Sequence, residues 1–128
     1  MKRKALTKKE QKIIKTFQDL GISRVESHIL MYMFTKEKVT AKDIEKNADL
    51  KQPDVSLGTH ALMDREWIKI SSITKKGKGR PYHRYSLTKP KEYILNEIQR
   101  RIEKRIELER RGIQTLHDLL DVKNQLLF

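Results

Sequence analysis

Residues 69–91 constrain the fold more than any other part of the chain, because they contain eight lysines and arginines and no acidic residue. Strand-forming side chains lie on both sides of a loop built from lysine and glycine. The sequence therefore predicts strands at residues 67–73 and 82–87 joined by residues 74–81. Such a hairpin needs an apolar layer against one face, so the rest of the chain must supply helices for it to pack on.

Four segments before the hairpin carry the start signals and the apolar spacing of helices. Thr7 and Ser23 are each followed three residues later by a glutamate, at Glu10 and Glu26, in the pattern of a capping box. The first of these helices is expected to end at Gly21. The apolar residues expected on the inner faces of the first two helices are Ile13, Ile14, Phe17, Leu20, Val25, Ile29, Leu30, Met33 and Phe34.

Two further helices are predicted, a short one over residues 40–48 that opens with Thr40 and Asp43, and a longer one over residues 52–65. Pro53 suits the first turn of the longer helix, where a missing backbone N–H costs nothing. The side chains expected to face inward from these two helices are Ile44, Ala48, Val55, Thr59, Leu62 and Met63. Helices followed by a β-hairpin, with connections this short, are the element order of a winged helix-turn-helix domain, mainly α with a small β-hairpin.

The final third of the chain reads as a long helix dense in opposite charges at four-residue spacing. Its apolar residues form a heptad-like stripe, interrupted by Gln99 and Glu109, that consists of Leu95, Ile102, Ile106, Ile113, Leu116 and Leu120. This stripe predicts packing against a helix of another subunit, with a helix folded back on its own domain as the alternative. Gly112, in the helix interior, predicts a bend or two helices that meet there.

The predicted organisation has three parts: a basic N-terminal tail at residues 1–6, a winged helix-turn-helix domain at residues 7–89, and a helical dimerisation segment at residues 90–128. At 128 residues there is material for one compact domain and one extended element.

The distribution of charge favours an anionic partner. The net charge of +12 comes from residues 1–15 and 69–91, while residues 16–68 are slightly acidic and residues 92–128 are neutral. Nucleic acid and anionic membrane are the main partners for such a chain. No apolar run approaches the roughly 20 residues that span a bilayer, and no apolar stretch follows the basic N-terminus as a secretory signal requires. The sequence therefore predicts a cytoplasmic protein with no membrane partner.

The sequence contains no motif typical of an enzyme, and it predicts no cofactor. There is no cysteine, no glycine-rich phosphate loop, no nucleophile elbow and no clustered acid pair, so we expect no enzyme. Four histidines raise the question of a metal. His117 and Asp121 lie four residues apart, and a dimer would double them into four ligands, but isolated surface histidines are the commoner explanation, and we expect no metal.

The predicted helix over residues 52–65 carries the side chains expected to read base edges. Gln52, Ser56 and His60 follow at four-residue spacing on the side opposite Leu62, and a helix of this kind fits the major groove of B-form DNA. Asp54 would either accept from cytosine or stabilise the helix dipole, and Gln52 would either pair with adenine or cap the helix. The complete predicted set on this helix is Gln52, Pro53, Asp54, Ser56, Leu57 and His60.

The predicted wing supplies cations for phosphate groups. Glycines between them let the backbone approach closely, and the predicted residues are Lys75, Lys76, Lys78, Arg80 and Arg84. The basic tail at residues 1–6 would add a second phosphate contact or serve only as a solubilising tail. On the hairpin itself, Trp67 is expected to pack on the helices, and of Tyr82 and Tyr85 at most one is buried, because they lie on opposite strand faces.

The stretch from Gln52 to Ile68 resembles the recognition-helix signature of winged helix-turn-helix regulators of the arsenical-repressor (ArsR) and multiple-antibiotic-resistance (MarR) families. The matching positions are Gln52, Pro53, Val55, Ser56, Leu62 and the pair Trp67-Ile68. Residues 20–26, Leu-Gly-Ile-Ser-x-x-Glu, and residues 79–85, Gly-Arg-Pro-Tyr-His-Arg-Tyr, are similar to archaeal regulators of the TrmB type. The families often have Arg at the position of Leu57 and Gly at that of Glu66, which leaves the base contact and the following turn open.

This resemblance implies a homodimeric transcriptional regulator that binds double-stranded DNA by sequence. TrmB-type proteins commonly carry a large sugar-binding domain after the winged helix, for which 128 residues leave no length. Whether a small molecule regulates the protein is left open. Two alternatives use the same fold: an architectural protein that binds DNA without regard to sequence, and a winged helix that docks onto other proteins.

Overall fold

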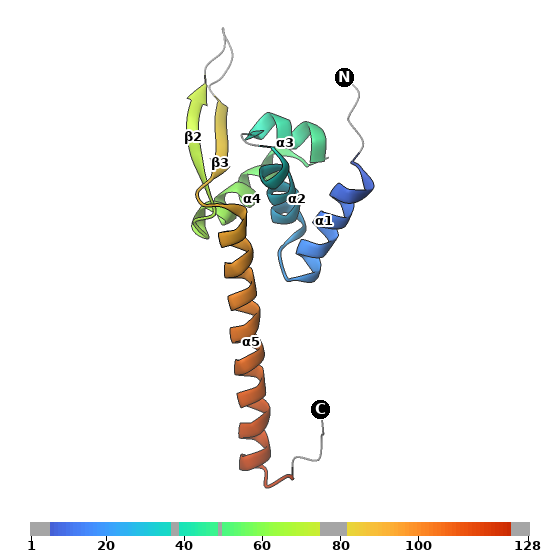
Figure 1. Ribbon diagram of the computed structural model, residues 1–128, viewed down its shortest axis with the longest axis vertical. Helices are drawn as coiled ribbons and strands as arrows, with labels where there is room; N and C mark the ends of the chain where they lie inside the picture. The colour runs from blue at the N-terminus through green and yellow to red at the C-terminus, as the bar shows by residue number, and fades with distance from the viewer. Residues whose placement is uncertain (1–5, 37–38, 49, 75–81, 124–128) are drawn as a thin grey trace. The chain divides into compact units, whose positions relative to one another are not determined.

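The computed structural model describes residues 6–36, 39–48, 50–74 and 82–123. Contacts divide the chain into two compact units, residues 1–94 and residues 95–128. The order of elements is α1 (Lys8–Asp19), α2 (Arg24–Thr35), β1 (Val39–Thr40), α3 (Ala41–Ala48), α4 (Gln52–Asp64), β2 (Ile68–Thr74), β3 (Tyr82–Leu87) and α5 (Lys91–Leu119) (Figure 1). The winged-helix fold predicted from the sequence is confirmed, with helices followed by a β-hairpin and a long last helix.

Side-chain caps start the first helices where the sequence predicted them. At α1 the Glu10 N–H donates to Thr7 Oγ1 (3.1 Å), and the Thr7 N–H donates to Glu10 Oε1 (2.9 Å), which completes a capping box. Thr40 and Asp43 make the same reciprocal pair at α3, with both bonds at 3.1 Å. Ser23 caps α2 by accepting from the Glu26 N–H (3.2 Å), and its own hydroxyl donates to the Glu26 carboxylate (2.8 Å).

The sheet has three strands in the order β1-β3-β2, all antiparallel. The hairpin of β2 and β3 (Figure 1) was predicted. Strand β2 starts one residue later than expected. Strand β1 was not predicted, because two residues are too short to show an alternating pattern; Val39 pairs with Tyr85 on β3. Ser71 is an extra residue on β2, and its hydroxyl donates to the Arg84 carbonyl (3.0 Å) across this bulge.

The core of residues 1–94 forms where α2, α3, α4 and the hairpin meet. The exposed fraction of Ile29, Leu30, Ile44 and Leu62 is 0%, and that of Trp67 is 1%, so the expected packing role of Trp67 is confirmed. Among the residues expected inside, Leu20 is instead 37% exposed, because α1 ends in a turn at that position. The side chain of Ala48, also expected inside, lies outside the described part of the chain.

Helices α2 and α4 pack closely at Gly58, which is buried. A Cβ at this position would lie 2.5 Å from Ile29 Cδ1 and 2.5 Å from Val25 Cγ1. Val25 is β-branched and stiff at its first side-chain torsion, so it has little freedom to move away. The absence of a side chain at Gly58 therefore sets how closely α4 lies on α2.

Helix α5 is a single helix of 29 residues that continues through Gly112. The expectation that two helices meet there is wrong, since the helix hydrogen bonds tolerate one glycine at a cost of about 1 kcal/mol. Most of the apolar stripe is exposed: Leu95, Ile106, Ile113, Leu116 and Leu120 are between 42% and 66% exposed, and Ile102 is half-buried. Across the part of the chain that is described, no helix has both the length and the apolar character needed to cross a bilayer.

Candidate nucleic-acid interface

Helix α4 has one face in the core and one on the surface. Val55, Gly58, Thr59 and Leu62 are buried, as the sequence predicted for three of them. The residues predicted to contact DNA lie on the other side. Of these, Gln52, Pro53, Ser56, Leu57 and His60 are exposed, and Asp54 is half-buried.

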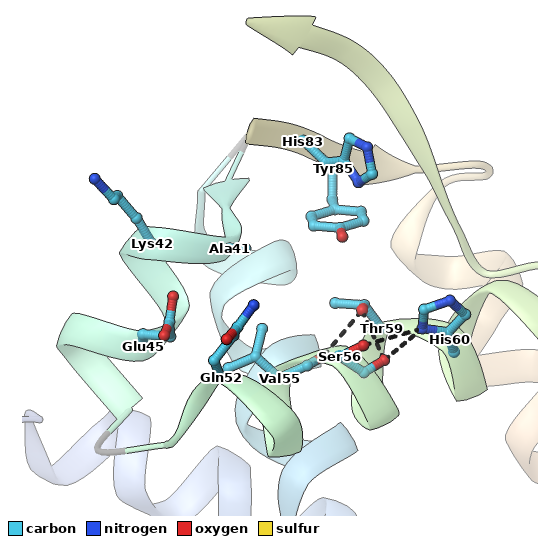
Figure 2. Close-up of a pocket in the computed structure, with 10 residues that line it drawn as sticks. All are labelled: Ala41, Lys42, Glu45, Gln52, Val55, Ser56, Thr59, His60, His83 and Tyr85. Carbon is cyan, nitrogen blue, oxygen red and sulfur yellow. Dashed lines mark hydrogen bonds between the residues drawn. The ribbon is translucent and has the colours of Figure 1, made fainter. Parts of the chain in front are cut away.

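The exposed face of α4 borders a groove of about 310 Å³ shared with α3 and β3. Figure 2 shows Gln52, Ser56 and His60 along one side of this groove, with His83 and Tyr85 of β3 opposite them. The residues that line the groove are Ala41, Lys42, Glu45, Gln52, Val55, Ser56, Thr59, His60, His83 and Tyr85. The polar side of α4 and the second strand of the hairpin therefore border one continuous surface.

Four of these lining residues were not predicted: Ala41, Lys42 and Glu45 of α3, and His83 of β3. They reach the groove because β1 pairs with β3 and brings the start of α3 alongside the hairpin. No local pattern in the sequence signals this arrangement. The predicted cap at Thr40 marks where α3 begins, but it does not indicate which strand lies beside that turn.

Hydrogen bonds within α4 orient two of the predicted base-reading residues. His60 Nδ1 lies 2.7 Å from the Ser56 carbonyl oxygen, and because that oxygen can only accept, Nδ1 carries a proton. The Ser56 hydroxyl lies 3.5 Å from the same nitrogen (Figure 2). In the neutral ring Nε2 is then an acceptor, and in the protonated ring it is a donor, so His60 can meet either kind of group.

The first turn of α4 resolves one of the open alternatives. Lys51 is the N-cap and makes no side-chain capping bond, so Gln52 is the first residue of the helix and not its cap. Pro53 occupies the first turn as expected, and Asp54 lies in the same turn, where the helix dipole stabilises a carboxylate.

The turn after α4 has a residue in a left-handed conformation. Glu66 has φ of 64°, at the position where the families that this stretch resembles often have glycine. The Thr88 hydroxyl donates to the Glu66 carbonyl (2.5 Å), and the Trp67 N–H donates to the Leu62 carbonyl (3.1 Å). The turn thus has the geometry that favours glycine, and this chain builds it with glutamate at a cost of about 1 kcal/mol.

The part of the hairpin that is described contains only some of the predicted contacts. The wing residues Lys75, Lys76, Lys78 and Arg80 lie outside the described residues, as do residues 1–5 of the basic tail. Arg84, the remaining wing residue, lies on β3 and is half-buried. Tyr85 is buried at 6% exposure, and its hydroxyl is directed towards α4 in Figure 2, whereas the side chain of Tyr82 is outside the described set.

A largely buried ion pair ties the end of α4 to the start of α2. Arg65 Nε lies 2.8 Å from Glu26 Oε1, and the Ser23 hydroxyl donates to Glu26 Oε2 (2.8 Å). The Arg65 guanidinium also lies 5.0 Å from the centroid of the Trp67 ring. Burial alone would raise the pKa of Glu26, but the hydrogen bonds from Arg65 and Ser23, together with the Arg65 charge, lower that pKa below its ordinary value. This cluster fixes the point where the helix turns into the hairpin.

The histidine near the C-terminal end of α5 has a structural partner. His117 Nδ1 lies 3.1 Å from the Val122 carbonyl oxygen, and the Val122 N–H donates to the His117 carbonyl (3.0 Å). Asp121 has φ of 54°, in the turn that these bonds close. Within the described ranges, no group of three or more His, Asp or Glu side chains is arranged to hold a metal ion.

One protein-family model matches this chain, and several solved structures are similar to it. Residues 17–91 match the family model described as "Sugar-specific transcriptional regulator TrmB". A possible transcriptional regulator from Methanosarcina mazei Go1 has a TM-score of 0.61 at 15% identity, covering 82% of this chain and 86% of that one. A structure described only as a transcriptional regulator has a TM-score of 0.52 at 15% identity, covering 89% and 75%.

These two structures support the fold alone, because their identities are low. Comparison with curated proteins gave no match. The family model spans more than half of the chain and includes α3, α4 and β3, which are the elements that line the groove. The chain therefore belongs to the TrmB family and is a transcriptional regulator of the winged-helix type.

Proposed function

We propose that this regulator binds double-stranded DNA by sequence, as a homodimer, with α4 in the major groove and the wing on the flanking backbone. The observation that carries the proposal is the line of Gln52, Ser56 and His60, exposed at four-residue spacing along a groove shared with the wing strand β3. Side chains of this kind form hydrogen bonds with base edges, and an α-helix fits the width of the major groove.

The composition of α4 favours sequence reading over indifferent binding. The helix contains no lysine or arginine, and its two charged residues, Asp54 and Asp64, are acidic. A protein that binds DNA without regard to sequence relies on cations that meet phosphates. Here such cations lie outside α4, in the wing at Lys75, Lys76 and Lys78. The wing would therefore hold the protein on the phosphate backbone, while α4 reads the bases.

The proposed dimer uses α5. Its apolar stripe presents Leu95, Ile106 and Leu116 to solvent at 46%, 42% and 53% exposure. Side chains of this size stabilise a structure by about 1.5–3 kcal/mol each when they are fully buried. Two α4 helices held by such a dimer would read half-sites about one helical turn of DNA apart.

The decisive experiment is selection of bound sequences from a random duplex pool, followed by competition. We expect the selected site to be retained against random duplex by a factor of about a thousand or more. Gln52→Ala and Ser56→Ala should relax the selected sequence, and Gln18→Ala, an exposed glutamine on α1, is the matched control. Equal affinity for selected and random duplexes would instead favour the architectural alternative.

The wing is tested by salt dependence. The triple change Lys76→Ala, Lys78→Ala and Arg80→Ala should weaken binding to every duplex and reduce the slope of log K against log salt by about 2 to 3. Removing three cations from the other unit, with Lys104→Ala, Arg111→Ala and Lys123→Ala, controls for net charge and should leave the slope nearly unchanged. An unchanged slope in the wing variant would refute the wing assignment, and a lack of DNA affinity in the unaltered chain would favour the docking alternative.

A further inference from the structure

The stripe on α5 is part of a complete heptad pattern with two polar positions. Steps of four and three residues alternate without a break through Leu95, Gln99, Ile102, Ile106, Glu109, Ile113, Leu116 and Leu120. Gln99 and Glu109 are both exposed and lie on the same face as the apolar residues. A helix that pairs through this face must therefore place an amide and a carboxylate in its seam.

A parallel pair of α5 helices would match each seam residue with itself. Glu109 would then face Glu109 of the partner subunit, which brings two carboxylates together where water is largely excluded. A carboxylate pair of this kind opposes the parallel arrangement.

An antiparallel pair centred on Lys104 matches polar with polar and apolar with apolar. Gln99 then lies opposite Glu109 of the partner subunit, and Leu95 lies opposite Ile113 of the partner subunit. Ile102 lies opposite Ile106 of the partner subunit at the middle of the pair. Moving one helix by a heptad destroys this match, because Glu109 then faces either Ile106 or Glu92 of the partner subunit.

The side chains have the hydrogen-bonding groups that this register needs. In the single chain one N–H of the Gln99 amide donates to Glu103 Oε1 (2.9 Å). The amide has two N–H donors, so the second can meet a carboxylate oxygen from the facing helix. A polar pair in an apolar seam costs stability but specifies one register, because every other register leaves it unpaired.

We propose that α5 pairs with α5 of a second copy of this chain in antiparallel orientation, in the register that places Gln99 opposite Glu109 of the partner subunit. The proposal rests on the homodimer of the proposed function and adds its orientation and register. The arrangement is two-fold symmetric, so the same polar contact forms twice.

Disulfide trapping tests the register directly, because the chain has no cysteine of its own. The double variant Leu95→Cys/Ile113→Cys leaves both polar residues in place. Its two sulfurs are eighteen residues apart on one helix, about 27 Å, so they cannot join within a chain. After mild oxidation of the full chain, we expect a covalent dimer on a non-reducing gel that returns to monomer with reductant.

The single variants Leu95→Cys and Ile113→Cys are the matched controls, and we expect neither to form a covalent dimer. A covalent dimer from a single variant would show a parallel pair and overturn the proposal. A second pairing, Ile102→Cys chains mixed with Ile106→Cys chains, guards against poor disulfide geometry at one layer. If neither pairing is trapped while light scattering gives a dimer mass, the register is wrong and the homodimer stands. A monomer mass would refute the homodimer itself.

The role of the polar pair is tested by removing it. Gln99→Ile/Glu109→Ile should dimerise at least as tightly, because an apolar seam replaces two polar layers. When these changes are combined with Leu95→Cys/Ile113→Cys, the yield of covalent dimer should fall, because other registers become populated. An undiminished yield would show that the polar pair does not determine the register.

Discussion

The winged-helix unit and the C-terminal helix contain the same kind of ion pair in two different settings. In the first unit Arg65 Nε lies 2.8 Å from Glu26 Oε1, with side chains 22% and 8% exposed. On α5, Arg111 Nε lies 3.1 Å from Glu107 Oε1, with side chains 72% and 56% exposed. The first pair joins residues far apart in the sequence, and the second joins neighbouring turns of one helix.

Two glycines inside helices repeat this contrast. Gly58 lies against α2, where a Cβ would be 2.5 Å from two side chains, whereas a Cβ at Gly112 would meet nothing within 4 Å. Residues 1–94 thus hold one close-packed arrangement through contacts of their own. The described part of α5 keeps most of its apolar stripe exposed, and we propose that a second copy supplies the missing contacts.

The largest effect is expected from breaking the largely buried ion pair. Arg65→Met leaves the Glu26 carboxylate without its cation and should lower the free energy of unfolding by about 3 kcal/mol. Urea denaturation at one fixed protein concentration measures this change. The matched variant Arg111→Met should cost only a few tenths of a kcal/mol, because that pair is exposed to solvent. Equal losses in the two variants would show that burial does not make the Glu26–Arg65 pair the stronger one.

The next effect is expected at the close contact between α2 and α4. Gly58→Ala should destabilise the protein by about 1–3 kcal/mol, because the new methyl group forces Ile29 and the stiff Val25 to move. Thermal unfolding followed by circular dichroism reports the change. A second variant, Gly58→Ala/Val25→Ala, should recover part of the loss, and no recovery would show that the contact with Val25 is not the cause.

Acid sensitivity should follow the Glu26–Arg65 pair. The pKa of Glu26 in the folded protein lies below its ordinary value of 4.5, so the ionised pair stabilises the fold above that pH. Its contribution should decline as the pH falls below about 4.5 and through the folded pKa. Measuring unfolding from pH 7 to pH 3 in the unaltered chain and in Glu26→Gln should show a steeper decline in the unaltered chain. Parallel declines would contradict this role.

The smallest effect is expected at the other glycine. Gly112→Ala should raise the stability of α5 by up to about 1 kcal/mol, because alanine has a higher helix propensity and the site has open space around it. Helix content and thermal midpoint, compared at equal protein concentration, provide the measurement. Destabilisation would instead indicate that a facing helix lies close to Gly112 in the assembled protein.

Local signals in the sequence predicted most of the elements correctly. Thr7 with Glu10 and Thr40 with Asp43 form the reciprocal caps that their spacing suggested, because a capping box needs only residues within one turn. The hairpin was also predictable, because β-forming residues flank a loop of glycine and lysine. Strand β1 and the contribution of Lys42 to the groove were not, because both depend on which distant strand lies alongside.

The candidate interface divides in the same way. The exposed line of Gln52, Ser56 and His60 follows from the four-residue spacing of a helix whose other side is apolar. The groove that these residues share with His83 depends on the packing of α3 against β3, which no local spacing encodes. The Glu26–Arg65 pair was missed for a related reason, since Glu26 was assigned to a cap and its partner lies 39 residues away.

The sequence alone determined where helices begin, which of their faces are apolar, and where positive charge gathers, because these properties depend on residues within a few positions of one another. Packing between distant segments set which faces meet. It produced the third strand, the close contact at Gly58, and the groove between α4 and the wing strand. These depend on the simultaneous burial of residues far apart in the chain. Only the folded chain satisfies their volumes, hydrogen bonds and charges together.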